Sequence, residues 1–365
     1  MKKRKNIIII AAVVVIGLVA LIIAKHGAKD ATFDQDFHVE DVNSITKIYL
    51  ADKQNHHVLL QRVSADSTAD TLWTVDTIYP ASQPMVDLLL ETLHDMRIRQ
   101  QVNKNAVPQA IKLLSARAVK VEVYQRKYFI NWFGGKFKLF PHEKLAVPYF
   151  VGHETQDMMA CHMFREGDKV PYIIHIPGFR GYLTPRFIAD PLAWRSHSVV
   201  HWDVRHLQSV ELDIPASPDQ SFAVRRQGEG FSFELTQSHA MVNGFDTARV
   251  AQMLSSFANL NFDEFACNVP NSNMDTSFNA GPRAILRVTS TEGKTREVKT
   301  YLKYLNPDDR AAMPDSNLYE MFDINRLYAI IDSKDTVLIQ YYTFDNILQP
   351  ASFFLGQQGN DFAAQ

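Results

Sequence analysis

The chain has 365 residues, a net charge of −2 and a hydrophobic fraction of 46%. This near-zero charge provides no global field that would favour nucleic acid, so we expect no nucleic-acid partner. Two cysteines are too few for a fold that depends on disulfides, whereas 23 Phe and 13 Tyr suit packing in β-sheets.

The first segment predicts a membrane anchor. Residues 1–6 carry four cationic side chains and form a predicted cytoplasmic tail, and residues 7–24 are an unbroken apolar run. At 1.5 Å per residue this run would be about 27 Å long, close to the hydrocarbon thickness of a bilayer. The positive flank places the N-terminus inside, and the rest of the chain follows in the periplasm. A cleaved signal peptide is the alternative, but the run is longer than such segments and Ala24-Lys25-His26-Gly27-Ala28 is a poor cleavage site.

The remaining chain contains the same pattern twice. The stretch Asp41–Leu50 recurs in pattern as Asp203–Leu212, at an offset of 162 residues, and later apolar positions recur at offsets of 164 and 165. Such a slow drift is typical of a duplicated domain with small insertions. We therefore predict a linker at 25–40, repeat module 1 at 41–187, a connection at 188–202, repeat module 2 at 203–353 and a flexible tail at 354–365.

Each module is predicted to begin with strands and continue with one substantial helix. Module 1 has period-two alternation at 44–51, extended segments at 57–63 and 71–76, and then a helical period over 83–96 with Ser82 as its cap. A short helix near 107–115 and strands at 98–102, 118–124, 128–133, 136–140, 149–151, 162–165 and 172–176 follow. Gly134-Gly135 is a hairpin signal.

Module 2 is predicted to repeat this order. Its strands are expected at 207–213, 221–226, 230–235, 285–290, 296–304, 327–331 and 337–342, its helix at 247–258, and a polar loop at 268–281. The predicted fold class is α+β: an N-terminal transmembrane helix followed by two duplicated, strand-dominated antiparallel modules, each with one main helix packed on a sheet.

Several stretches resemble the domain of unknown function 4340 family. They are the N-terminal anchor, the opening Val42–Leu60, and the segments Lys138–Leu145, Tyr149–Asp157 and Pro177–Leu183. The resemblance implies a membrane-anchored, repeat-built envelope protein of the Bacteroidota type, with some relatives linked to transporter auxiliary proteins. It implies no catalytic residues.

The sequence contains no motif that predicts catalysis. It has no P-loop, G-x-G-x-x-G, G-x-S-x-G, H-E-x-x-H or C-x-x-C pattern, so we predict no enzyme activity and no cofactor. The densest set of metal-type ligands is His153-Glu154 with Cys161-His162. Because its members lack paired short spacings, we predict no metal site there. Cys161 and Cys267 could form one disulfide or remain two buried thiols.

The segment Pro177–Arg195 combines arginines and aromatic residues, which suits either recognition or contact between the modules. We single out Arg180, Tyr182, Arg186, Trp194 and Arg195. Arg180 aligns with Asp345 in the second copy, so the shared fold does not require a cation there. We expect Arg180 to pair with a carboxylate of the other module, and the alternative is that it faces an acidic partner or headgroup.

The predicted function follows from the anchor, the repeat and the missing motifs. We expect a non-catalytic, single-pass protein of the inner membrane that binds the bilayer through residues 7–24. Its periplasmic part would bind or support a protein partner in an envelope transport or assembly system, such as a transporter-associated complex. The alternatives are a periplasmic glycan- or lipid-binding module and an enzyme of unrecognised class.

Overall fold

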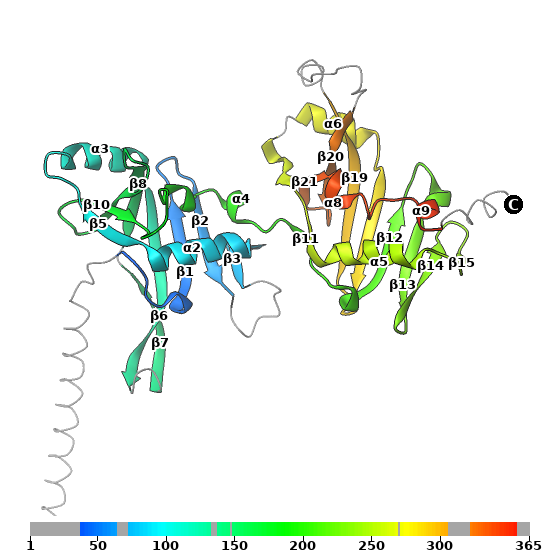
Figure 1. Ribbon diagram of the computed structural model, residues 1–365, viewed down its shortest axis with the longest axis horizontal. Helices are drawn as coiled ribbons and strands as arrows, with labels where there is room; N and C mark the ends of the chain where they lie inside the picture. The colour runs from blue at the N-terminus through cyan, green and yellow to red at the C-terminus, as the bar shows by residue number, and fades with distance from the viewer. Residues whose placement is uncertain are drawn as a thin grey trace, which may run out of the picture. The chain divides into compact units, whose positions relative to one another are not determined.

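The computed structural model describes residues 37–63, 72–132, 137–146, 148–268, 271–305 and 322–355. The chain divides into two compact units, Met1–Ser196 and His197–Gln365 (Figure 1). Each unit is built around one large antiparallel sheet with its own apolar core, and each is described separately below.

The first unit contains a ten-stranded sheet with the order β4-β3-β2-β1-β6-β8-β9-β10-β5, and β7 pairs with β6 outside this path. Its strands are β1 (Ile45–Ala51), β2 (His57–Arg62), β3 (Trp73–Val75), β4 (Tyr79–Pro80), β5 (Arg97–Gln101), β6 (Val119–Trp132), β7 (Phe137–Leu145), β8 (Tyr149–Glu154), β9 (Cys161–Arg165) and β10 (Tyr172–His175).

Helix α2 (Gln83–Asp95) carries the chain from one edge of this sheet to the other, because β4 and β5 lie at opposite ends of the strand order. Ser82 occupies the N-cap position without a side-chain hydrogen bond to the helix, and Pro84 lies in the first turn. The apolar residues Val86, Leu89, Leu90 and Leu93 are buried, and they join the core formed with the sheet. A second helix, α3 (Val107–Arg117), lies over β8 and β9, and a short one, α4 (Pro191–Trp194), ends the unit.

The second unit contains a nine-stranded sheet with the order β15-β14-β13-β12-β18-β19-β20-β21-β17. Its strands are β12 (Leu207–Asp213), β13 (Phe222–Gln227), β14 (Gly230–Leu235), β15 (Ala240–Val242), β17 (Glu264–Phe265), β18 (Ala284–Ser290), β19 (Thr295–Tyr304), β20 (Phe322–Ile331) and β21 (Asp335–Gln340). A separate pair joins β11 (Ser198–Val200) to β16 (Leu260–Asn261).

Helix α5 (Thr247–Ser256) crosses between the edge strands β15 and β17, as α2 does between β4 and β5. Asp246 caps α5 by accepting hydrogen bonds from the backbone N–H groups of Ala248 and Arg249. Helix α6 (Asn271–Asn279) packs on β19, and α8 (Tyr341–Phe344) and α9 (Ala351–Leu355) follow the last strand. The strand orders of the two sheets therefore match element by element, including the crossing helix.

The predicted fold class is wrong. Among the described residues, strands of two large antiparallel sheets are the commonest secondary structure, and each unit carries a second helix on its sheet, α3 or α6, besides the predicted main helix. The polar segment 268–281, expected to be a loop, contains α6 because Phe278 packs against Tyr301 and Tyr328. Among the described residues no helix is long and apolar enough to cross a membrane. The span predicted at 7–24 and residues 356–365 of the predicted tail lie outside them. The flexible tail was expected to begin at 354, but Phe354 is buried in α9 (Ala351–Leu355).

Several local predictions are confirmed. Helices were expected at 83–96, 107–115 and 247–258, and the structure has α2, α3 and α5 there. The strands predicted at 207–213 and 230–235 match β12 and β14. Leu90 and Leu254 are both buried, as the helical register required. The two strands predicted at 118–124 and 128–133 are one continuous strand, β6. Its C-terminal part extends beyond the residues that pair with β1 and β8.

Candidate functional site

The strongest candidate for an interaction surface is the hairpin formed by β6 and β7. The pairing of β6 with β1 ends at Gln125, and its pairing with β8 ends at Val121. Beyond these residues β6 pairs only with β7, from Arg126↔Glu143 to Trp132↔Phe137. The hairpin therefore extends past the other strands of the first unit, as Figure 1 shows.

This hairpin exposes large apolar side chains at consecutive positions. Phe129 is 67% exposed and Phe140 is 64% exposed, while Phe137, Leu139 and Leu145 are exposed as well. Leu139 pairs with Ile130, and Phe129, the neighbour of Ile130 in β6, points to the opposite face, so the exposure of both Leu139 and Phe129 means that neither face of the ribbon packs on a core. Monomeric proteins rarely leave such clusters in water unless they bind something.

The backbone at Phe140 adds a second sign of a functional constraint. Phe140 has a φ of 56°, in the left-handed region that bulky residues avoid, and it precedes Pro141. Strain of this kind costs on the order of 1–3 kcal/mol and tends to persist at functional positions. The ring of Phe129, at the position opposite Phe140, stacks on His142 with a centroid separation of 4.1 Å.

The hairpin also carries a cationic excess. Its described charged side chains are Arg126, Lys127, Lys138 and Lys144 against the single carboxylate of Glu143. Glu143 is already paired with Lys47 of β1 at 2.8 Å. Burial acts to raise the pKa of Glu143, but hydrogen bonds from Lys47 and Thr46 outweigh it, so the pKa lies below its usual value. Among the described residues, no carboxylate pairs with Arg126, Lys127 or Lys138.

The segment 177–195, predicted to serve recognition or contact between the modules, makes several contacts within the first unit. Trp194 is fully buried and its indole Nε1–H donates to the backbone oxygen of Ile188 at 2.8 Å. Arg186 donates to the Thr92 hydroxyl of α2 at 2.8 Å and lies over the Phe179 ring. Arg195 lies over the Tyr79 ring at 3.8 Å and pairs with Ala81 through a β-bridge.

Arg180 and Tyr182 complete this set. Arg180 is exposed, and no ion pair joins it to a carboxylate of the described residues; Tyr182 is half-buried. The pairing of Arg180 with the other module stays a prediction. Trp194 and Arg186 make contacts that fix a loop to the core, and Arg180 is the only one of the five residues that is exposed.

The structure brings His153 and His162 together, on the neighbouring strands β8 and β9. Their rings stack with centroids 4.2 Å apart and planes 16° from parallel. Burial lowers the pKa of His153, and the proximity of His162 lowers it further. Stacked rings do not direct two nitrogens at one ion, and no group of three or more His, Cys, Asp or Glu among the described residues is placed to hold a metal.

The two cysteines are not bonded to each other in the structure. Cys161 is buried, whereas Cys267 is exposed, so the expectation of two buried thiols is wrong for Cys267. Burial raises the pKa of Cys161 to about 12. The protonated thiol is a poor nucleophile, which argues against a cysteine hydrolase at Cys161-His162. The pair Asp308-Asp309 lies outside the described residues.

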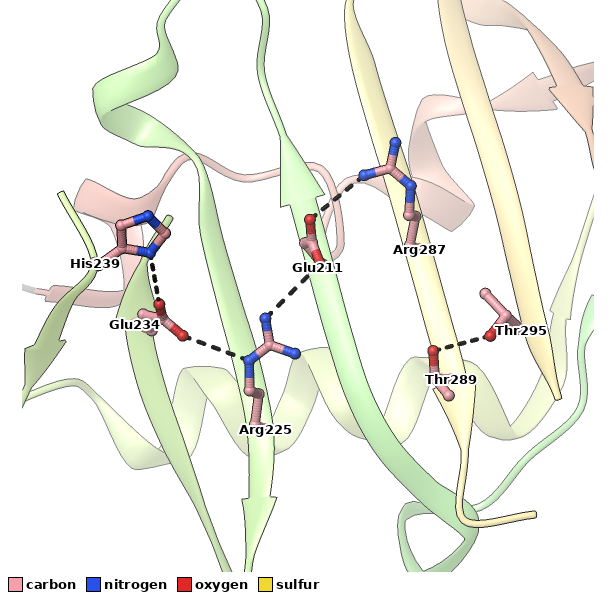
Figure 2. A network of polar contacts seen from close by, with 7 residues as sticks. All are labelled: Glu211, Arg225, Glu234, His239, Arg287, Thr289 and Thr295. Carbon is pink, nitrogen blue, oxygen red and sulfur yellow. Dashed lines mark hydrogen bonds and ion pairs between the residues drawn. The ribbon is translucent and has the colours of Figure 1, made fainter. Parts of the chain in front are cut away.

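The sheet of the second unit carries a row of charges on the face away from α5 (Figure 2). Arg287 of β18 lies opposite Glu211 of β12 and Glu297 of β19, with nitrogen–oxygen distances of 3.4 and 2.9 Å. Arg225 of β13 continues the row to Glu234 of β14 at 3.4 Å.

At one end of this row, Nδ1 of His239 lies 3.3 Å from Glu234. Near the other end, the hydroxyl groups of Thr289 and Thr295 form a hydrogen bond (Figure 2). Each charge faces an opposite charge on the next strand, so cross-strand pairing satisfies the row internally. Partly exposed pairs of this kind contribute about 0–1 kcal/mol each. We therefore interpret the row as an ordinary solvent-exposed face of the sheet. The β6–β7 hairpin remains the better candidate for an interaction surface.

Sequence reasoning placed the hairpin but missed that it extends beyond its neighbouring strands and exposes its side chains. The signal was present: apolar residues occupy successive positions of 128–130 and 139–140 rather than alternate ones, with Arg126-Lys127 and Lys138 beside them. A strand with one buried face would alternate. No family model, curated protein or solved structure matches the chain. The resemblance to the domain of unknown function 4340 family stays a prediction.

Proposed function

We propose that this protein is a non-catalytic, membrane-tethered component of the cell envelope that binds or holds a partner in a transport or assembly system. Residues 7–24 would tether the chain, and both units would lie in the periplasm. The observation that carries the proposal is the β6–β7 hairpin. It projects from a well-packed unit and exposes aromatic and cationic side chains together.

The chemistry of the described residues agrees with a binding role. The cysteine of the first unit is buried with a raised pKa, the two neighbouring histidines stack on each other, and the charges of the second sheet are paired across strands. None of these arrangements supplies a nucleophile with a positioned base or a set of converging metal ligands. The matching strand orders of the two sheets also support the proposal that one module was duplicated.

Site-directed photocrosslinking in native membranes tests the proposal. A photoreactive amino acid replaces Phe140 on the hairpin or, as the matched control, Tyr342 of the second unit, which is 93% exposed. We expect light-dependent adducts from position 140 and none from position 342, with mass spectrometry identifying what was captured. No adduct at position 140, or the same adducts from both positions, would contradict the proposal.

A further inference from the structure

We infer that the β6–β7 hairpin rests on the surface of an anionic phospholipid bilayer, with its aromatic side chains at headgroup level and its cations against lipid phosphates. This inference rests on the proposed membrane tether, and it names a lipid surface, rather than a protein of the transport or assembly system, as what the hairpin contacts. It assigns the first unit a second, peripheral contact with the membrane.

The exposure of both faces of the hairpin favours a bilayer over a protein surface. A folded partner would cover one face of a two-stranded ribbon and leave the other in water. Leu139 pairs with Ile130, and Phe129, the neighbour of Ile130 in β6, points to the opposite face, yet both Leu139 and Phe129 are exposed, at 39% and 67%. The headgroup region of a bilayer can surround both faces at once.

The charge of the hairpin fits an anionic surface. Arg126, Lys127 and Lys138 have no carboxylate partner among the described residues, and Glu143 is held by Lys47. Basic side chains near an anionic membrane surface are attracted to it, and the attraction falls off within a Debye length. Aromatic rings and long cationic side chains are the residue types that settle at the membrane interface, because each has an apolar body and a polar end.

The open edges of the hairpin limit how it can bind. Beyond Gln125, one edge of β6 and one edge of β7 pair with no other strand of the described chain. Unpaired backbone groups cannot enter the hydrocarbon core, so the hairpin would stay in the hydrated headgroup region. Addition of a partner strand is also disfavoured, since Pro141 and the left-handed Phe140 interrupt β7 and Lys127 lies on β6.

The chain length places the hairpin within reach of the membrane. Phe37 is 4% exposed and packs against Tyr149 and Tyr172, so the linker from the predicted anchor enters the first unit at a fixed point. Residues 25–36 can span at most about 40 Å. The seven residues 126–132 of β6 extend about 23 Å beyond the β1 pairing. A tether of this length keeps the effective concentration of the hairpin at the membrane high.

Hydrogen exchange of the full chain in nanodiscs tests the inference. One set of nanodiscs contains phosphatidylcholine alone, and the other contains an equal mixture of phosphatidylcholine and phosphatidylglycerol. We expect amide exchange in residues 125–145 to slow by about tenfold in the anionic discs relative to the neutral ones, and the effect to shrink at high salt. The hairpin of β13 and β14 serves as the internal reference and should exchange equally in both.

A charge-reversal variant, K127E together with K138E, should abolish the difference between the two lipid compositions. The matched control is K104E with K112E, which reverses two exposed lysines elsewhere in the first unit and should leave the difference intact. Equal exchange of residues 125–145 in both lipids would overturn the inference. Protection seen only in native membranes that contain proteins would also overturn it, in favour of a protein partner. A chain that does not stay in any nanodisc would contradict the proposed tether itself.

Discussion

Three consecutive leucines on α2 provide the sharpest test of the fold of the first unit. Leu89 is fully buried in the core, Leu90 is 9% exposed, and Leu88 is 37% exposed. Replacing Leu89 by Ala removes three carbon atoms from the core, a transfer term of about 2.4 kcal/mol, and adds a cavity term. We expect L89A to lower the free energy of unfolding by about 2–5 kcal/mol.

The matched control is L88A, one residue earlier on the same helix. Its side chain is already partly in water and leaves no enclosed cavity, so the expected cost is about 1–1.5 kcal/mol. Urea unfolding of the full chain in detergent, with W202F in every variant to remove the tryptophan of the second unit, is followed by the fluorescence of the buried Trp73 and Trp194 and reports on the first unit. Equal losses for the two variants, or a larger loss for L88A, would refute the packing of α2 on the sheet.

Three further predictions concern the second unit. L254A should lower the free energy of unfolding by about 2–5 kcal/mol, measured by hydrogen exchange of α5, because Leu254 is 2% exposed; a loss below about 0.5 kcal/mol would reject its register. D246A should cost about 1 kcal/mol in urea unfolding, since it removes the α5 cap, and D246N should restore most of the loss. Burial acts to raise the pKa of Glu297, but hydrogen bonds from Arg287 and Lys299 outweigh it and hold the pKa below its usual value. The stability that Glu297 contributes is therefore fully present above the pKa of this group in the unfolded chain, and it is lost as the pH falls through the lowered pKa of the folded state. In E297Q, the free energy of unfolding should depend less steeply on pH in the acid range.

Local sequence patterns predicted helices and many strands, but not the sheets that they form. The apolar spacing of Val86, Leu89, Leu90 and Leu93 defined α2, because packing on one face imposes a helical period. The same reasoning could not show that β5 joins β10 at the far edge, since pairing partners distant in sequence leave no periodic signal. Long-range pairing decided the fold class, and the predicted class was wrong for that reason.

The segment that became α6 shows a different limit. Its composition is polar, which favours a loop, but Met274 and Phe278 are four residues apart and pack against the cluster around Tyr301 and Tyr328. Tertiary packing outweighed the weak helix propensity of the intervening residues. The spacing of those two apolar residues was the available signal.

The candidate site was predictable only in part. Gly134-Gly135 indicated a hairpin, and the residues of 128–140 were recognised as strands. Their exposure depends on β6 continuing past the ends of its pairing with β1 and β8, which the sequence does not encode locally. Conversely, the arginines and aromatic residues of 177–195 suggested a contact surface, but Trp194 and Arg186 form hydrogen bonds within the first unit, to the backbone of Ile188 and to Thr92 of α2.

The central claim is that residues 7–24 tether the chain with both units outside the cytoplasm, and Cys267 tests it directly. Cys267 is exposed in the second unit, while Cys161 is buried with a pKa raised to about 12, so a thiol reagent should label only Cys267 in the folded protein. We expect a membrane-impermeant maleimide to label Cys267 in spheroplasts that express the full chain, and C267S to remain unlabelled. Labelling of Cys267 only after lysis would contradict the account.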